Sequence, residues 1–230
     1  MPRNDHRTPA ASSIPLNPPT IPLVSTRLAG LTGVTLQEAP TVCHRCVWWQ
    51  SKGSRRVDKR RWIERAETDW GAWGAVYYDD DGSVIGSMQY GPSALFPRAW
   101  ELPAGPPSED AVLVTCAYLL DRASPWVMQS LFLAAIGDAR DKRAKALETF
   151  AYRYPEGESA HERFLVHRTV FPRDFLSDFG FETVRTLGHV ELVRLDLGGL
   201  QPVAEGSRAK VLRLVKEAFS PAPAPVPPSP

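Results

Sequence analysis

The sequence has little of what marks an exported, membrane-spanning or strongly charged protein. It holds three cysteines in 230 residues and no apolar run long enough to cross a bilayer. Its 27 basic and 26 acidic residues leave a net charge of +1, so no field of one sign draws the molecule to nucleic acid or to a membrane. Residues 1–26 contain no hydrophobic signal core. An odd number of cysteines without an export signal predicts a reducing, cytoplasmic setting.

The cysteines are also too few for a metal site. Cys43 and Cys46 form one Cys-x-x-Cys pair, but there is no second pair, and Cys116 is far away in the sequence. Structural zinc takes four ligands, so we predict no bound metal. The pair lies in a segment, residues 42–50, that we interpret as extended. Buried structural thiols are favoured over a redox or metal role, and both stay open.

What is present fits one domain with tails. Apolar residues make up 43% of the chain, enough for a single core at this length. Residues 1–26 are rich in proline and polar residues and are predicted to be a disordered tail. Residues 27–200 are predicted to form the folded domain, 201–219 an amphipathic helix, and 220–230 an extended, proline-rich tail.

The clearest signal lies in the middle of the chain. Ala111–Leu120 is a nearly unbroken apolar run, which is typical of a strand covered on both faces. Ser124 and Pro125 suit an N-cap and a first helical position. The apolar stretch Trp126–Ala139 predicts a helix buried along most of its length. With a further strand at 146–152, these elements predict a βαβ unit with parallel strands.

Weaker signals predict the remaining elements. They are extended segments at 34–36 and 42–50, a basic helix over 52–70, a hairpin of 75–78 and 84–89, a long loop at 91–108, a short helix at 172–179, and a last hairpin of 181–186 and 190–197. From its residues alone, the basic helix allows two interpretations: a solvated face, or a surface that tracks a phosphate backbone. The solvated face is favoured, because Trp62, Ala66 and their neighbours make a plausible buried stripe.

This order of elements resembles the GNAT superfamily of N-acetyltransferases, over roughly Val34 to Leu197. The best local matches are Gly82–Gly86, the central unit, and Phe175–Phe181. The resemblance implies an α/β (α+β) fold in which a mixed central sheet, flanked by helices, splays open between its fourth and fifth strands. It also implies acetyl-CoA as the donor and an amine-bearing acceptor, either a small molecule or a protein. The resemblance also places the basic helix beside the acceptor cleft, which adds a third interpretation of its charges, selection of an acidic acceptor. Monomer and homodimer both stay open.

The resemblance also implies where acetyl-CoA binds. In that family the pantetheine arm lies in the splay, and the pyrophosphate sits on the helix start, where N–H groups and the helix dipole attract an anion. The corresponding residues here are Ala117, Leu119, Arg122, Ser124, Trp126, Val127, Met128 and Gln129. The family's loop, Gln/Arg-x-x-Gly-x-Gly/Ala, is replaced by Ala-Ser-Pro-Trp-Val-Met at 123–128. Trp126 and Met128 therefore stand where glycine would admit phosphate oxygens.

The acid and the base of the reaction are less clear. The family's tyrosine, which protonates the leaving thiolate, is replaced by Leu176. The candidate substitutes are Tyr118, Tyr152 and Tyr154. A base must reach the acceptor amine, and the candidates are Glu148, Glu156, Glu158, His161 and Glu162. From these residues we select Glu148, Tyr152, Glu156 and His161 as the candidate catalytic set. For Glu148, the alternative is a structural, paired carboxylate.

Two functions follow from the sequence. The first is an acyl-CoA-dependent N-acetyltransferase. The alternative is a GNAT-fold binding or regulatory module that has lost efficient CoA binding. The order of elements favours the enzyme, whereas Trp126, Met128 and Leu176 favour the module. The enzyme is our working hypothesis.

Overall fold

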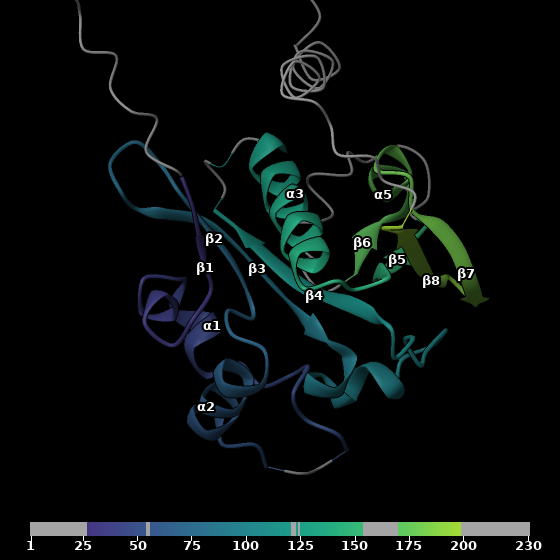
Figure 1. Ribbon diagram of the computed structural model, residues 1–230, viewed down its shortest axis with the longest axis horizontal. Coiled ribbons are helices and arrows are strands. Elements are labelled where there is room, and N and C mark those ends of the chain that lie inside the picture. Colours follow the sequence, from purple (N-terminus) through teal and green to yellow (C-terminus); the bar gives the residue numbers. More distant parts are fainter. Residues whose placement is uncertain (1–26, 54–55, 121–122, 124, 154–169, 199–230) are drawn as a thin grey trace, which may run out of the picture.

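A mixed sheet forms the centre of the computed structural model, which describes residues 27–53, 56–120, 123, 125–153 and 170–198 (Figure 1). The eight strands follow the order β1-β2-β3-β4-β5-β8-β7, with β6 paired to β5. Their bounds are β1 Leu28–Gly30, β2 Gly74–Tyr78, β3 Val84–Pro92, β4 Ala111–Leu119, β5 Ala146–Tyr152, β6 Phe171–Pro172, β7 Glu182–Leu187 and β8 Val190–Asp196. β4 and β6 are parallel to β5, and the other pairs are antiparallel. The predicted α/β fold with a mixed sheet is confirmed.

Helices cover both faces of this sheet. They are α1 Thr41–Arg45, α2 Lys59–Asp69, α3 Pro125–Asp141 and α5 Arg173–Asp178, with 3-10 turns η1 Thr35–Gln37, η2 Ser93–Leu95 and η3 Pro97–Trp100. Side chains of α3 and α5 share one buried core, and those of α2 and the segment around α1 share a second core on the opposite face. Within the described ranges, no helix is long and apolar enough to cross a membrane.

The central βαβ unit is confirmed. β4 and β5 run parallel from the pair Ala111–Ala146 to the pair Val114–Thr149, and α3 connects them. The inner side of α3 is buried in the first core, but Trp126 and Leu133 are 42% and 48% exposed. Buried residues occur from Val127 to Ala139, as predicted for a helix buried along most of its length, and the two exposed side chains lie on the side of α3 that faces away from the sheet.

The segment before α2 differs from its prediction. Residues 34–36 and 42–50 are not strands, because they contain η1, α1 and a turn at 48–50. Leu36, Ala39 and Trp49 are buried in the second core, so packing on the sheet decides their conformation rather than the local preference of valine and threonine for strands. The predicted tails 1–26 and 220–230 and the predicted helix 201–219 lie outside the described residues.

The basic helix is shorter than predicted but has the favoured solvated face. Trp62 and Ala66 of α2 are buried. Its arginines are exposed beside acidic neighbours, in the pairs Arg60–Glu64, Arg61–Asp58 and Arg65–Asp69. The charges of these arginines are therefore balanced locally.

The absence of a side chain at Gly86 allows α3 to approach β3. A methyl group at Gly86 would lie 2.8 Å from Val127 Cγ1, 3.0 Å from Leu119 Cδ2 and 3.3 Å from Leu131 Cδ1. These distances are shorter than ordinary van der Waals contacts, so the sequence can hold α3 this close only with glycine at this position.

We expect Gly86→Ala to lower the free energy of unfolding by about 1–3 kcal/mol, the usual cost of overpacking a core. The control is Gly137→Ala in the interior of α3, where a methyl group would meet no atom within 4 Å. This control should gain up to about 1 kcal/mol, because alanine favours the helix over glycine. Urea unfolding of the three proteins measures both values. Equal stability of Gly86→Ala and the wild type would contradict the close approach of α3.

Candidate functional site

β4 and β5 separate halfway along their length. Their pairing begins at Ala111 of β4 with Ala146 of β5 and ends at Val114 with Thr149. At the point of separation, the Thr149 hydroxyl donates a hydrogen bond of 2.9 Å to the Val114 carbonyl. Beyond it, β4 continues on β3 alone, while β5 pairs with β6 and β8. Among the described residues, no strand lies against Thr115–Leu119 on the β5 side, so the sheet splays as predicted.

A β-bulge lies at the point where the two strands part. Tyr90 pairs with Val114 and Gln89 with Cys116, which leaves Thr115 as an extra residue in β4. The Thr115 hydroxyl accepts a hydrogen bond from Gln89 Nε2 at 2.8 Å and donates one to the Gln89 carbonyl at 3.1 Å. The bulge shifts the alternation of β4 side chains between the two faces of the sheet, so that Cys116 faces the same core as Leu113.

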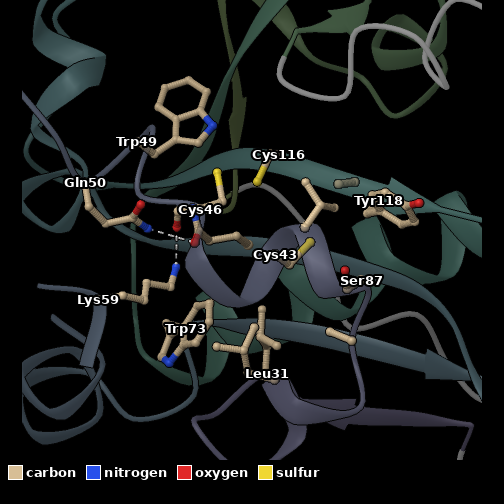
Figure 2. Close-up of a pocket in the computed structure, with 15 residues that line it drawn as sticks. Leu31, Cys43, Cys46, Trp49, Gln50, Lys59, Trp73, Ser87, Cys116 and Tyr118 are labelled. Carbon is tan, nitrogen blue, oxygen red and sulfur yellow. Dashed lines mark hydrogen bonds between the residues drawn. The ribbon is translucent and has the colours of Figure 1, made fainter. Parts of the chain in front are cut away.

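A pocket of about 140 Å³ lies beside this bulge, on the face covered by α1 and α2 (Figure 2). Its lining comes from three parts of the chain. The residues are Leu31, Leu36, Ala39, Val42, Cys43, Cys46, Trp49 and Gln50 from the first part, Lys59 and Trp73 from the second, and Ser87, Gln89, Cys116, Ala117 and Tyr118 from β3 and β4. Most of these side chains are apolar, so the pocket suits an apolar group.

The polar groups of the pocket include one cation and two amides. Lys59 Nζ donates a hydrogen bond of 2.9 Å to the Cys46 carbonyl. It also lies 4.8 Å from the ring centroid of Trp62 and 5.2 Å from that of Trp73, distances typical of cation–π contacts. Burial lowers the pKa of Lys59 below its ordinary value. Gln50 Nε2 donates to Gln89 Oε1 at 2.9 Å.

All three cysteines line this pocket. Cys43 lies on α1 and Cys46 directly after it, so the prediction of a strand or loop is wrong for Cys43. Burial raises the pKa of Cys116 to about 12, and the nearby Cys43 and Cys46 add to this shift. A thiol with such a pKa stays protonated at neutral pH and is a poor nucleophile. Within the described part of the chain, no three His, Cys, Asp or Glu side chains come together to hold a metal.

The residues predicted to bind acetyl-CoA fall into three groups by their position in the structure. Ala117, Leu119, Val127 and Met128 are buried in the core under α3, and Gln129 is buried as well. Arg122 and Ser124 lie outside the described residues. Trp126 is partly exposed and stacks edge-on against Tyr77 of β2, with ring centroids 5.1 Å apart. Since β3 and β4 separate β2 from β5, the indole leans away from the splay.

The predicted catalytic residues do not come together in the described structure. Glu148 is fully buried and accepts hydrogen bonds from the Ser108 amide (2.7 Å), the Ser108 hydroxyl (2.6 Å) and Arg194 Nη1 (3.0 Å). It is therefore a paired carboxylate, the structural alternative left open by the sequence. Tyr152 is half-buried, with its ring 5.8 Å from that of His189. Glu156 and His161 lie outside the described residues, as do Tyr154, Glu158 and Glu162.

The pocket itself could not be read from the sequence. Lys59 follows Asp58, which caps α2, and so looks like one more charge of a basic helix. Gln50, Gln89 and Trp73 carry no motif at all. Of the two candidate proton donors that the structure describes, Tyr118 and Tyr152, Tyr118 lines the pocket.

The contacts of Glu148 predict a large loss of stability on substitution. Glu148→Gln removes one charge of a buried pair, and breaking such a pair costs about 3–5 kcal/mol. The variant leaves Arg194 with a second acidic partner, because its Nη1 lies 3.1 Å from Asp110 Oδ1. The loss should therefore lie at the low end of this range. The exposed Glu109→Gln is the control and should stay within about 0.5 kcal/mol of the wild type. Unchanged stability of Glu148→Gln in urea unfolding would refute this structural role.

The burial of Cys116 predicts a difference in reactivity among the three thiols. With a pKa of about 12 for Cys116, only about one molecule in ten thousand carries the reactive thiolate there at pH 8. N-ethylmaleimide should therefore modify the exposed Cys46 much faster than the partly buried Cys116 in the folded protein, and both thiols at similar rates after unfolding in urea. Mass spectrometry of the peptides measures this, with Cys46 as the internal control. Equal rates at both positions in the folded protein would contradict the burial of Cys116.

Solved structures of N-acetyltransferases resemble this chain in fold. An N-acetyltransferase from Staphylococcus aureus Mu50 is 15% identical, with a TM-score of 0.44, over 74% of this chain and 97% of its own. Ard1 from Thermoplasma volcanium is 12% identical, with a TM-score of 0.44, over 74% and 95%. The PaiA N-acetyltransferase from Thermoplasma acidophilum, solved with coenzyme A, is 12% identical, with a TM-score of 0.41, over 74% and 97%. No family model matches the sequence, and a comparison with curated proteins finds no relative. Likeness of this degree concerns the course of the chain and leaves activity to the geometry of the site.

Proposed function

We propose that this chain is an acyl-CoA-dependent N-acyltransferase that uses acetyl-CoA and an amine-bearing acceptor. The observation that carries the proposal is the open edge of β4. From Thr115 to Leu119 the strand has lost β5 as a partner, at a bulge that adjoins an apolar pocket. An unpaired strand edge offers N–H and C=O groups to an extended ligand that carries amides.

The pantetheine arm of acetyl-CoA has this chemistry. It is extended, carries two amides and ends in the thioester, so it fits the edge at Thr115–Leu119 as an added strand would. The thioester supplies an activated acyl group. In the transfer, the acceptor nitrogen forms a bond to the carbonyl carbon and loses a proton to a base, the bond from that carbon to sulfur breaks, and the thiolate takes up a proton. A backbone N–H of β4 that donates to the carbonyl oxygen would stabilise its developing charge.

The start of α3 bears on where the pyrophosphate would bind. α3 has 17 residues, and the first turn of a helix this long attracts anions. Val127 and Met128 are buried under the helix, and the Trp126 indole leans toward Tyr77. We propose that the side chains at the family's glycine positions do not obstruct the splay, with Arg122 and Ser124 as further contacts.

We keep Tyr152, Glu156 and His161 as proposed acid–base residues, because Tyr152 ends β5 and the other two follow it in the sequence. Tyr118 joins them, since it lines the pocket. Glu148 is assigned a positioning role through Ser108 and Arg194. We also propose the cytoplasm as its location, where the three cysteines would stay reduced.

One observation favours the alternative, a binding module without transfer activity. Leu176, at the position of the family's proton-donating tyrosine, is fully buried in the core and cannot transfer a proton. A module of this kind would keep the fold and lose acetyl-CoA binding. Direct measurement of acetyl-CoA binding therefore separates the two functions.

The test is calorimetric titration and thermal unfolding with acetyl-CoA, free CoA and longer acyl-CoAs. We expect saturable binding and a higher melting temperature, since a ligand of the folded state stabilises it by about 2.7 kcal/mol at a hundredfold excess over Kd. Absence of binding at millimolar concentration for every thioester would overturn the enzyme proposal and leave the module.

Substitution of Trp126 tests the same proposal at one residue. Because the indole leans away from the splay, Trp126→Ala and Trp126→Gly should bind acetyl-CoA as tightly as the wild type. Trp126→Ala should lose about 0.5–1.5 kcal/mol of stability, the value of one aromatic pair. Tighter binding by Trp126→Gly than by Trp126→Ala would instead show that the indole blocks the anion site.

A further inference from the structure

The pocket beside the bulge has a cation at one end and no anion in its lining. Lys59 contributes the ammonium group (Figure 2). Among the described residues that line the pocket, none is Asp, Glu or His. Within the described ranges, no carboxylate comes within 4 Å of Lys59 Nζ; the arginines of the same helix, Arg60, Arg61 and Arg65, each have an acidic partner. Lys59 therefore differs from its neighbours in turning inward without a counter-ion.

This placement is unfavourable for the empty protein. Lys59 is the first residue of α2, where the partial positive charge of the helix start disfavours a cation. Transfer of an ammonium group out of water is costly unless an anion accompanies it. The hydrogen bond to the Cys46 carbonyl and the faces of Trp62 and Trp73 offset part of this cost. An anion in the pocket would supply the missing partner.

We propose that this pocket binds a small organic carboxylate with an apolar body, and that the carboxylate pairs with Lys59. The apolar body would lie among Leu31, Leu36, Ala39 and Trp73. A cavity of about 150 Å³ with apolar walls accommodates benzene, so the volume of about 140 Å³ fits a group of that size. The pocket thus matches a carboxylate such as benzoate or hexanoate.

A carboxylate fits better than a phosphate. Phosphate sites use several cations or a row of backbone N–H groups, whereas Lys59 is the one basic residue among the lining residues that the structure describes. The other polar groups of the walls are neutral, and the Ser87 hydroxyl makes no hydrogen bond in the described part of the chain. In Figure 2, Ser87 and Tyr118 lie at the opposite end of the pocket from Lys59. A second, uncharged polar group on the ligand would find partners there.

The inference rests on the pocket alone and does not require acyl transfer. If transfer also takes place, the pocket adjoins the open edge of β4 and would hold the acceptor, which would then carry a carboxylate besides its amine. Binding of the carboxylate is measured without acetyl-CoA, so failure of one proposal leaves the other standing.

The experiment is calorimetric titration of the full chain with benzoate and hexanoate, each paired with its neutral amide. The carboxylates should bind at least tenfold more tightly than benzamide and hexanamide, because only the anions pair with Lys59. Equal affinity of benzoate and benzamide, or no binding of either carboxylate at millimolar concentration, would overturn the proposal.

Variants locate the site. Lys59→Met keeps most of the side-chain volume and should lose at least tenfold in benzoate affinity, while Lys59→Arg retains binding. The control is Lys52→Met, which removes an exposed charge from the same basic segment and should bind as the wild type does. Full affinity in a folded Lys59→Met protein would refute the pairing.

A pH series on the wild type tests the pairing of the carboxylate with Lys59 even if Lys59→Met does not fold. Affinity should fall as pH rises through the lowered pKa of Lys59, because the ammonium group loses its proton there. The thiols that face Lys59 are Cys43, Cys46 and Cys116, so the series is repeated with Cys46→Ser to separate the lysine from the exposed thiol. Affinity independent of pH up to 10.5, the ordinary pKa of lysine, would contradict the proposal.

Occupancy can also be read from the pocket wall. Benzoate should slow the alkylation of Cys43, which lines the pocket, and should leave the rate unchanged in Lys59→Met. Peptide mass spectrometry gives both rates. Protection that is equally strong in Lys59→Met would show that benzoate binds without the ammonium group.

Discussion

The extra residue at Thr115 is the constraint on which the rest of the site depends. Its two contacts with Gln89 hold the bulge in β4, and the Thr149 hydroxyl marks the last point at which β5 follows. Because the bulge shifts the alternation of side chains, one strand contributes Val114 and Ala117 to the core under α3, and Leu113 and Cys116 to the opposite face. Tight packing and an open edge thus occur in the same strand.

The two faces of the sheet are covered by elements of different length and packing. Under α3, a 17-residue helix lies against the strands so closely that Gly86 is required. The other face is covered by short elements, none longer than the 11 residues of α2, and by several tryptophans. Short elements and large rings fill a surface less evenly than one long helix does, and a pocket lies between them. The charged residue enclosed there, Lys59, is tolerated because aromatic faces and one carbonyl surround it.

The parts of the fold that the sequence predicts are those with a local cause. The apolar run of β4 and the turn residues of the hairpins act within a few positions, and these elements agree with the structure. The segment of η1 and α1 was predicted to be extended, and the structure shows otherwise. Its conformation depends on the burial of Leu36 and Trp49 against the sheet, and the residues of the sheet are distant in the sequence. The sequence shows Glu148 as a charge inside a strand. It does not show that Ser108 and Arg194, both distant in the sequence, are the hydrogen-bond partners of this carboxylate. Lys59 gave no signal, because its environment is made of residues far from it in the sequence.

The cover of the pocket has a consequence for how molecules reach it. η1 has three residues, and α1 has five with no side-chain cap at its start. Segments with so few internal hydrogen bonds open at a small fraction of the global free energy of unfolding, whereas central strands exchange their amide hydrogens only in rare, large openings. Local opening of residues 35–46 therefore gives access to the interior while β3 and β4 stay paired. The kinetics of entry and exit would be set by this short segment, and the shape of the site by the sheet.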